Sequence, residues 1–209
     1  QFPNTQFILT THDRIWMRHM KTEGVIGNRA GVFFRSWDVD HGPAQWEDKD
    51  VWGEIEEYLK QDNVHAAAGA LRKYLEFTAG ELCHALRAQV EYRGDAQYQL
   101  GELLPSAVRR MKELLKRAKA IAQSWKQDAE LAQIAERERR FNDAFTAAEG
   151  DRWQVNAAIH FNAWDNLGRQ DFAPVAKAMK NLIGQFFCDK CQGVYRVTPE
   201  REGIQALRC

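Results

Sequence analysis

Three of the four cysteines in this sequence could bind a metal ion together. Cys188 and Cys191 form a C-x-x-C pair, and Cys209 follows after 17 intervening residues. Thiolates two residues apart on a tight turn, here helped by Gly193, can reach one tetrahedral Zn²⁺ ion. The segments VYRV and IQALR between Cys191 and Cys209 suit the two strands of a zinc ribbon. Because structural zinc takes four ligands, we expect the fourth to be a cysteine that follows Cys209.

Two other interpretations of the C-x-x-C pair stay open. A redox pair would be expected in a thioredoxin-like βαβ context, which the surrounding sequence does not suggest, and unliganded thiols need no particular context. Cys83-His84 is a more remote candidate for the fourth zinc ligand. Cys83, however, lies in a predicted amphipathic helix, where a buried thiol is the ordinary case. We therefore favour structural zinc at Cys188, Cys191 and Cys209.

A histidine follows the first apolar run of the chain. Residues 6–11, QFILTT, show little alternation, which is typical of a strand covered on both faces in a parallel sheet. Such a strand would bring His12 to the carboxyl edge of the sheet, where α/β folds bind ligands. A neutral imidazole there can contact a phosphate or orient a water molecule, although an isolated histidine is more often structural. Asp13 is a candidate N-cap for a helix that follows.

The order Q-F-I-L-T-T-H-D at residues 6–13 resembles the segment after the Walker B strand in ATPases of the SMC, Rad50 and RecF group of the ABC class. Four later segments resemble the C-terminal half of SMC/RecF-like ATPases of bacterial anti-phage defence loci: HAAAGALRKYLEFTAGELCHAL, YQLGELLP, NAAIHFNAWDNL and FFCDKCQG. The resemblance touches most of the chain. It implies that His12 is the switch histidine near the γ-phosphate, and that ATP and Mg²⁺ bind to the full-length protein.

The resemblance also implies what the chain needs from elsewhere. The sequence has no G-x-x-x-x-G-K-[ST] loop, no acidic Walker B strand and no LSGGE-like signature. We therefore expect the C-terminal segment of an ATPase head, which is not catalytically competent alone. The implied partners are the remainder of its own head, a second head in a homodimer, a partner subunit in phage or plasmid defence and, as a further possibility, DNA. The alternative is a stand-alone zinc-binding helical interaction module without nucleotide chemistry.

Three further groups of residues have both a chemical and a simpler explanation. Arg14 and His19 fit the R-x4-H spacing of HEPN ribonucleases, but they follow a predicted buried strand rather than lying in a helical bundle. The basic stretch 109–119 fits a DNA-facing stripe or, more commonly, the solvated side of a helix. In HFNAW at 160–164, the polar and aromatic side chains of His160, Asn162 and Trp164 fit a site or a loop tethered by its own hydrogen bonds.

Composition limits the classes of partner. The 209 residues are 44% hydrophobic, and Lys plus Arg equal Asp plus Glu at 29 each, so no global charge favours nucleic acid or an anionic membrane. No apolar run approaches the roughly 20 residues that span a membrane. The first residues also lack the succession of charged, apolar and small residues that is typical of a signal peptide. We therefore expect a cytoplasmic protein with no membrane contact.

The expected fold is an α/β edge of an ABC-type ATPase head, a mainly helical region and a small zinc ribbon, so that the chain alone is mostly α. Residues 1–49 would contain the head strands, the second at 31–39. Residues 50–150 would be helical, 151–187 a loop and a helix, and 188–209 the ribbon.

The longest predicted helix runs from Pro105 to about Ala148 and carries a heptad seam of apolar residues. The seam positions are Leu104, Val108, Met111, Leu115, Ala118, Ala122, Trp125, Ala129 and Ala132. Gly150 and Asp151 are expected to end this helix, and a final helix is expected from about Asp171.

Overall fold

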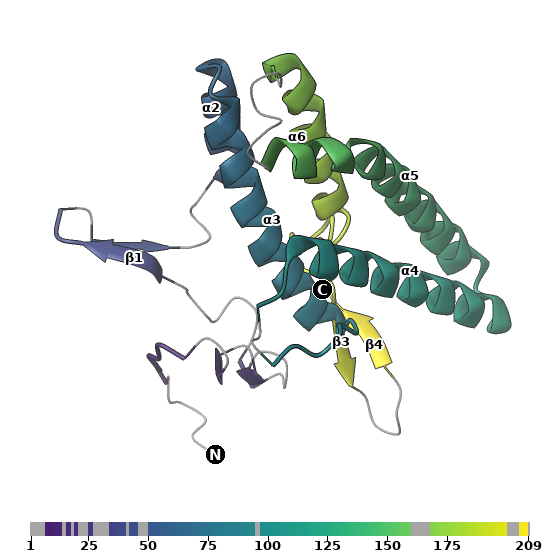
Figure 1. Ribbon diagram of the computed structural model, residues 1–209. Coiled ribbons are helices and arrows are strands. Elements are labelled where there is room, and N and C mark those ends of the chain that lie inside the picture. Colours follow the sequence, from purple (N-terminus) through teal and green to yellow (C-terminus); the bar gives the residue numbers. More distant parts are fainter. Residues whose placement is uncertain are drawn as a thin grey trace. The chain divides into compact units, whose positions relative to one another are not determined.

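The computed structural model describes residues 7–13, 16–17, 19–20, 25–26, 34–40, 42–45, 50–94, 97–159, 168–199 and 205–208. The chain divides into two compact units, Gln1–Asp48 and Lys49–Cys209 (Figure 1). The elements of each unit are described separately below.

The first unit contains an antiparallel hairpin of β1 (Phe34–Asp38) and β2 (Gly42–Gln45). Strand β1 lies within the range 31–39 expected from the sequence. Trp37 pairs with Pro43, and the register shifts between Phe34 and Ser36. The pairing is antiparallel, so among the described residues this unit contains no parallel sheet.

The prediction of a buried strand at 6–11 is wrong for its described part. Residues 7–11 lie outside any helix or strand, and Phe7, Ile8 and Leu9 are 67%, 82% and 63% exposed. A strand needs a neighbour for its backbone hydrogen bonds. The two sheets formed by the described residues, β1–β2 and β3–β4, do not include this segment.

The second unit is mainly helical, as expected for the chain alone. Its elements are α2 (Val51–Lys60), α3 (Val64–Leu86), α4 (Leu100–Ser124), α5 (Asp128–Ile159), α6 (Arg169–Gly184), β3 (Arg196–Pro199) and β4 (Gln205–Arg208). Helix α3 packs against α2 and α4, and α5 packs against α4 and α6. Figure 1 shows α4 and α5 side by side as a long helical hairpin. Among the described residues, no helix is both long enough and apolar enough to span a membrane.

Polar side chains start three of these helices. Asp50 accepts a hydrogen bond from the Gly53 N–H at 2.9 Å at the start of α2, and Asn63 accepts one from Ala66 at 3.1 Å at the start of α3. At α4, the Gln99 N–H donates to the Glu102 carboxylate at 2.8 Å. Each bond satisfies a backbone N–H group, at or next to the helix start, that lacks a partner within the helix.

The predicted helix from Pro105 to Ala148 is in fact two helices, α4 and α5. The chain reverses at Lys126, which has a positive φ of 56°. The Gln127 N–H donates to Ala122 O at 2.9 Å, and the Lys126 N–H donates to Gln123 O at 3.1 Å. These two bonds form a Schellman C-cap, which usually carries glycine at the left-handed position. Because a lysine occupies it here, the sequence gives no glycine or proline signal for the break.

The C-terminal limit of the predicted helix is also wrong. Helix α5 continues through Gly150 and Asp151 to Ile159, so the first part of the predicted loop in 151–187 is helical. A single glycine weakens a helix interior by only about 1 kcal/mol, which the rest of a long helix can offset. His160, Asn162 and Trp164 lie outside the described residues.

The core of the second unit is formed by the apolar faces of its helices. Seam residues Leu104, Val108, Met111, Leu115 and Ala122 are buried. The seam ends at the reversal: Trp125 is 70% exposed there, and Ala129 and Ala132 of α5 are exposed. Three phenylalanines, Phe141, Phe172 and Phe186, are fully buried where α5, α6 and the segment after α6 meet. The Phe141 and Phe186 rings pack edge to face with centroids 5.3 Å apart.

Candidate functional site

The C-x-x-C pair lies on a tight turn directly after α6. The turn is closed by hydrogen bonds from the Cys188 N–H to Gly193 O and from the Gln192 N–H to Cys188 O, both at 2.9 Å. Gln192 has a positive φ of 57°. An isolated β-bridge between Phe187 and Val194 joins the two ends of the turn. The turn thus holds both cysteines in a loop short enough for their thiols to face one ion.

The backbone of this turn also donates a hydrogen bond to Cys191. The Gly193 N–H donates to the Cys191 Sγ at 3.4 Å. The bond fixes the position of the Cys191 sulfur on the turn. Cys188 is buried and Cys191 is partly buried. The two thiols therefore fit a zinc ion in donor type and in spacing.

The third predicted ligand, Cys209, lies outside the described residues. Strand β4 pairs antiparallel with β3, and Arg208 lies opposite Arg196. The last residue of β4 therefore lies beside the first residue of β3. This is the end of β3 that follows the C-x-x-C turn in the sequence. Within the part of the chain that the structure describes, no three His, Cys, Asp or Glu side chains form a group that could hold a metal ion.

An arginine from α5 packs against the same turn, which the sequence did not indicate. Arg137 donates from Nη1 to the Tyr195 hydroxyl at 2.8 Å and from Nη2 to Gln185 O at 3.0 Å. Its guanidinium also lies 4.1 Å from the centre of the Tyr195 ring, in a cation–π contact. Arg140, one turn further along α5, forms an ion pair with Asp189 at 3.3 Å. Two arginines thus hold α5 against the cysteine-bearing turn.

Tyr195 connects the arginine contact with the thiols. Burial raises the pKa of Tyr195 to about 12; the Arg137 charge opposes this shift, and a hydrogen bond with Cys188 adds to it. The phenol is therefore neutral near pH 7 and can accept from Arg137 while it contacts Cys188. We refer to Arg137, Tyr195 and Gln185 as the α5 latch.

Cys83 lies in the core between α3 and α4. Its Sγ donates to Leu103 O at 3.1 Å. Burial raises the pKa of the Cys83 thiol to about 11, which keeps the sulfur protonated near neutral pH. This environment is typical of a structural thiol rather than a metal ligand.

His12 is exposed and lies next to a helix start. The Asp13 carboxylate accepts from the Trp16 N–H at 3.0 Å, so Asp13 is an N-cap as predicted. The Asp13 N–H donates to the Thr11 hydroxyl at 3.0 Å. His19 is exposed, and Arg14 lies outside the described residues.

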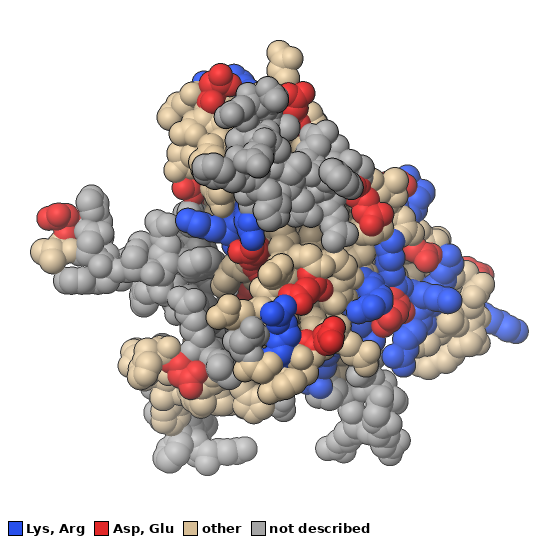
Figure 2. Space-filling model, in the orientation of Figure 1, with Lys and Arg blue, Asp and Glu red and all other residues tan. Residues whose placement is uncertain are grey.

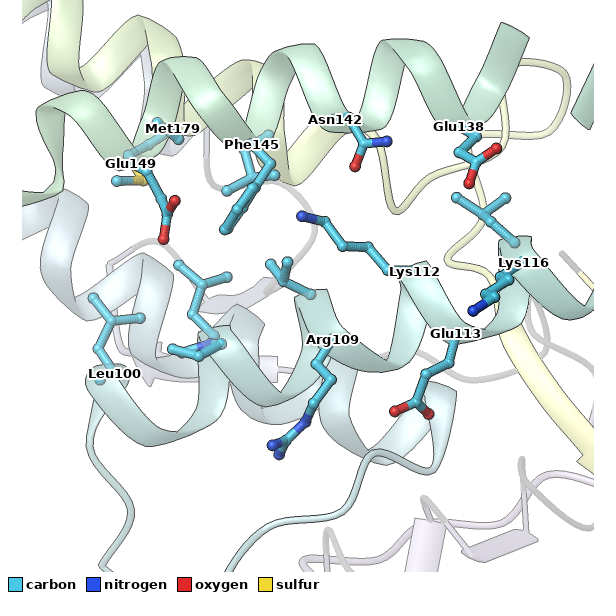
Figure 3. A pocket seen from close by; sticks show the side chains of 17 residues that line it. Leu100, Arg109, Lys112, Glu113, Lys116, Glu138, Asn142, Phe145, Glu149 and Met179 are labelled. Atoms are coloured by element: carbon cyan, nitrogen blue, oxygen red, sulfur yellow. The ribbon is translucent and has the colours of Figure 1, made fainter. Parts of the chain in front are cut away.

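A cavity of about 530 Å³ lies between α4, α5 and α6 (Figure 3). Its floor is mostly apolar and includes Leu104, Val108 and Met179. The Lys112 ammonium points from α4 toward α5 and lies 3.7 Å from the centre of the Phe145 ring. Further along the hairpin, an ion pair of 2.8 Å joins Lys119 of α4 to Glu138 of α5. The cavity is therefore an apolar groove with charged edges.

Comparison with family models, with curated proteins and with solved structures gives no match for this chain.

Proposed function

We propose that the chain is the C-terminal segment of an SMC/RecF-like ATPase head of the kind found in phage and plasmid defence. In this proposal His12 is the switch histidine, which contacts the γ-phosphate of ATP or the attacking water. The phosphate-binding loop and the Mg²⁺ ligands would come from sequence outside these 209 residues. Head–head pairing would then couple the nucleotide state to a partner subunit or to DNA.

One observation carries the proposal: three consecutive apolar side chains are exposed shortly before His12, separated from it by two threonines. Phe7, Ile8 and Leu9 are each more than 60% exposed, although burying such a side chain fully is worth roughly 1.5–3 kcal/mol. A contiguous exposed apolar run usually marks a surface that another element covers. This supports a surface at residues 7–9, close to His12, that another part of the full-length protein covers.

The C-terminal turn would hold structural zinc. Cys188, Cys191 and Cys209 are the proposed thiolate ligands, and the N–H donor at Gly193 supports the assignment for Cys191. Bound zinc would supply a cross-link between this turn and the end of the β3–β4 hairpin. The ion would have no role in hydrolysis.

Hydrogen exchange tests whether the apolar run is covered in the whole protein. The amides of residues 7–11 should exchange rapidly in the 209-residue chain and at least about 100-fold more slowly in the full-length protein. The amides of the α3 core, including Leu71 and Leu75, serve as the control and should be protected in both. Equal, rapid exchange of residues 7–11 in both proteins would remove the proposal's main support.

A second function is favoured by a different observation. Lys49–Cys209 forms a compact unit with its own hydrophobic core and its own groove. This supports a zinc-binding helical interaction module that needs no nucleotide. Under this alternative, the full-length protein would neither bind ATP nor protect residues 7–11.

A further inference from the structure

A second cavity, of about 310 Å³, is lined by four arginines where the end of α3 meets α4. Arg87 comes from the C-cap of α3, and Arg109, Arg110 and Arg117 come from α4. Glu113 is the one carboxylate among the described residues that line it, so the lining carries four positive charges and one negative charge. We refer to these four arginines as the arginine pocket.

The spacing along α4 places its charges on one side of the helix. Arg109, Glu113 and Arg117 are four residues apart, and Arg110 is seven residues from Arg117, so all four share a face. In Figure 3, the Arg109 and Glu113 side chains point away from α5. Both residues line the groove as well as the arginine pocket, so the two cavities adjoin at α4.

Backbone contacts fix two of the guanidinium groups. Arg110 donates from Nε to Leu86 O at 3.2 Å, and its Nη1 pairs with Glu113 at 3.4 Å. Arg109 donates from Nη2 to Gln89 O and to the Ser106 hydroxyl, each at 3.5 Å. A guanidinium has five N–H donors, and both bonds of Arg109 come from its Nη2, so its Nε and Nη1 can donate to a ligand. The side chains are therefore partly ordered before a ligand binds.

The chemistry of the arginine pocket favours phosphate groups. Arginine presents a planar fork that matches phosphate oxygens, and three of the four side chains (Arg87, Arg109 and Arg117) are exposed. Arg109 and Arg117 are separated by about 12 Å along the helix axis. At a rise of about 3.4 Å per nucleotide of one strand, that distance spans several backbone phosphates. Figure 2 shows further Lys and Arg side chains, with acidic ones among them, on the face where α4 and α5 lie.

We propose that the arginine pocket binds the phosphate backbone of duplex DNA. This inference deepens the proposed function and rests on it for its biological context, because DNA is one of the partners which that function invokes. Binding itself requires neither ATP nor zinc. If the protein does not bind duplex DNA, the hydrogen-exchange test of residues 7–11 is unaffected. Failure of the exchange test likewise leaves the DNA-binding test unaffected.

The test is the salt dependence of binding by the 209-residue chain to a fluorescent duplex of about 20 base pairs, from about 0.05 to 0.2 M KCl. The test variant is Arg87→Gln/Arg117→Gln. The matched control, Lys126→Gln/Arg169→Gln, also removes two exposed positive charges. Its Lys126 has a positive φ, like Arg87. Thermal melting checks that each variant is folded, and the single variant Arg117→Gln avoids any change at the α3 C-cap.

The proposal predicts that the slope of log K against log salt becomes shallower by about 1.8 in the double test variant and by about 0.9 in Arg117→Gln. At about 0.1 M salt the double test variant should bind at least roughly 10-fold more weakly, and the control should bind like wild type. No duplex binding at the lowest salt, or equal losses in test and control variants, would overturn the proposal. Arginine-dependent binding to anionic phosphatidylserine vesicles instead of the duplex would also overturn it.

Discussion

The α5 latch is predicted to hold the cysteine-bearing turn against the helical hairpin. In Arg137→Met, the side chain keeps most of its apolar length but loses the charge and both hydrogen bonds. In Tyr195→Phe, the ring remains under the guanidinium, and the hydroxyl contacts with Arg137 and Cys188 are lost. The two variants and their double mutant form a cycle that isolates the Arg137–Tyr195 hydroxyl contact.

The size of the effect follows from the contacts. Arg137 makes two charge-assisted hydrogen bonds, at 2.8 and 3.0 Å, each worth about 1.5–3 kcal/mol. Its Nε, however, is buried without a hydrogen-bond partner among the described residues, which costs about 1–3 kcal/mol and is relieved in the variant. We therefore expect Arg137→Met to lower the free energy of unfolding by about 2–3 kcal/mol. Tyr195→Phe should lower it by about 1–2 kcal/mol, and the coupling energy should be about 1–2 kcal/mol.

Urea unfolding of the 209-residue chain at fixed zinc concentration measures these changes. The control is Arg139→Met, two residues along the same helix. Arg139 is 63% exposed and pairs with Glu136 and Asp143 at the surface, so its loss should leave the unfolding midpoint nearly unchanged. A coupling energy below about 0.3 kcal/mol would refute the latch, because it would mean that the Arg137–Tyr195 bond does not form.

Four further predictions concern the metal, the core, the helix reversal and pH. Removal of zinc with a chelator should lower the melting temperature of the wild-type chain and not that of Cys188→Ser; equal shifts in both would exclude a metal at this turn. Phe141→Ala should cost about 3–5 kcal/mol in urea unfolding because the ring is fully buried, and a cost near 1 kcal/mol would contradict that packing. Lys126→Gly should stabilise the chain by about 0.5–1 kcal/mol, since glycine adopts the positive φ without strain; destabilisation would argue against the reversal. The pKa of Cys83 is raised by burial from 9.0 to about 11, so its contribution to stability should be complete below pH 9 and lost as pH rises toward 11. Cys83→Ala should reduce the loss of stability between pH 9 and 11. An unchanged pH profile of stability would contradict the raised pKa of Cys83.

The buried faces of the helices could be predicted from apolar spacing alone. In α6, the apolar residues at helical spacing are all buried: Phe172, Val175, Met179, Leu182 and Ile183. In α3, the same holds for Val64, Ala68, Leu71, Leu75, Leu82 and Leu86. These faces follow from the helical period because packing of an amphipathic helix depends mainly on which side is apolar.

The reversal between α4 and α5 could not be predicted in this way. The apolar spacing continues through Trp125 and Ala129, and the left-handed position is filled by Lys126 instead of glycine. Similar left-handed residues end α2 at Asp62 and α3 at Arg87. The polar Gln61-Asp62-Asn63 cluster does signal the end of α2, whereas no glycine marks the left-handed positions of Arg87 and Lys126.

The turn that carries Cys188 and Cys191 could be predicted from the sequence, but its neighbours could not. The C-x-x-C spacing identifies Cys188 and Cys191 because both lie on one turn. Arg137 and Tyr195 are 58 residues apart in sequence, and Arg137 belongs to a mixed-charge stretch that suggests a solvated helix face. Only the packing of α5 on the end of α6 brings them together. The exposed apolar run before His12 differs from the predicted strand because no described segment pairs with it.

The most direct test of the proposed ATPase role is single-turnover hydrolysis by the full-length protein with His12→Ala. A switch histidine that contacts the γ-phosphate or the attacking water predicts a rate about 100-fold or more below wild type. ATP affinity should be nearly unchanged, because other residues hold the nucleotide. Hydrolysis at the wild-type rate, or no detectable ATP binding by the wild-type protein, would contradict the account.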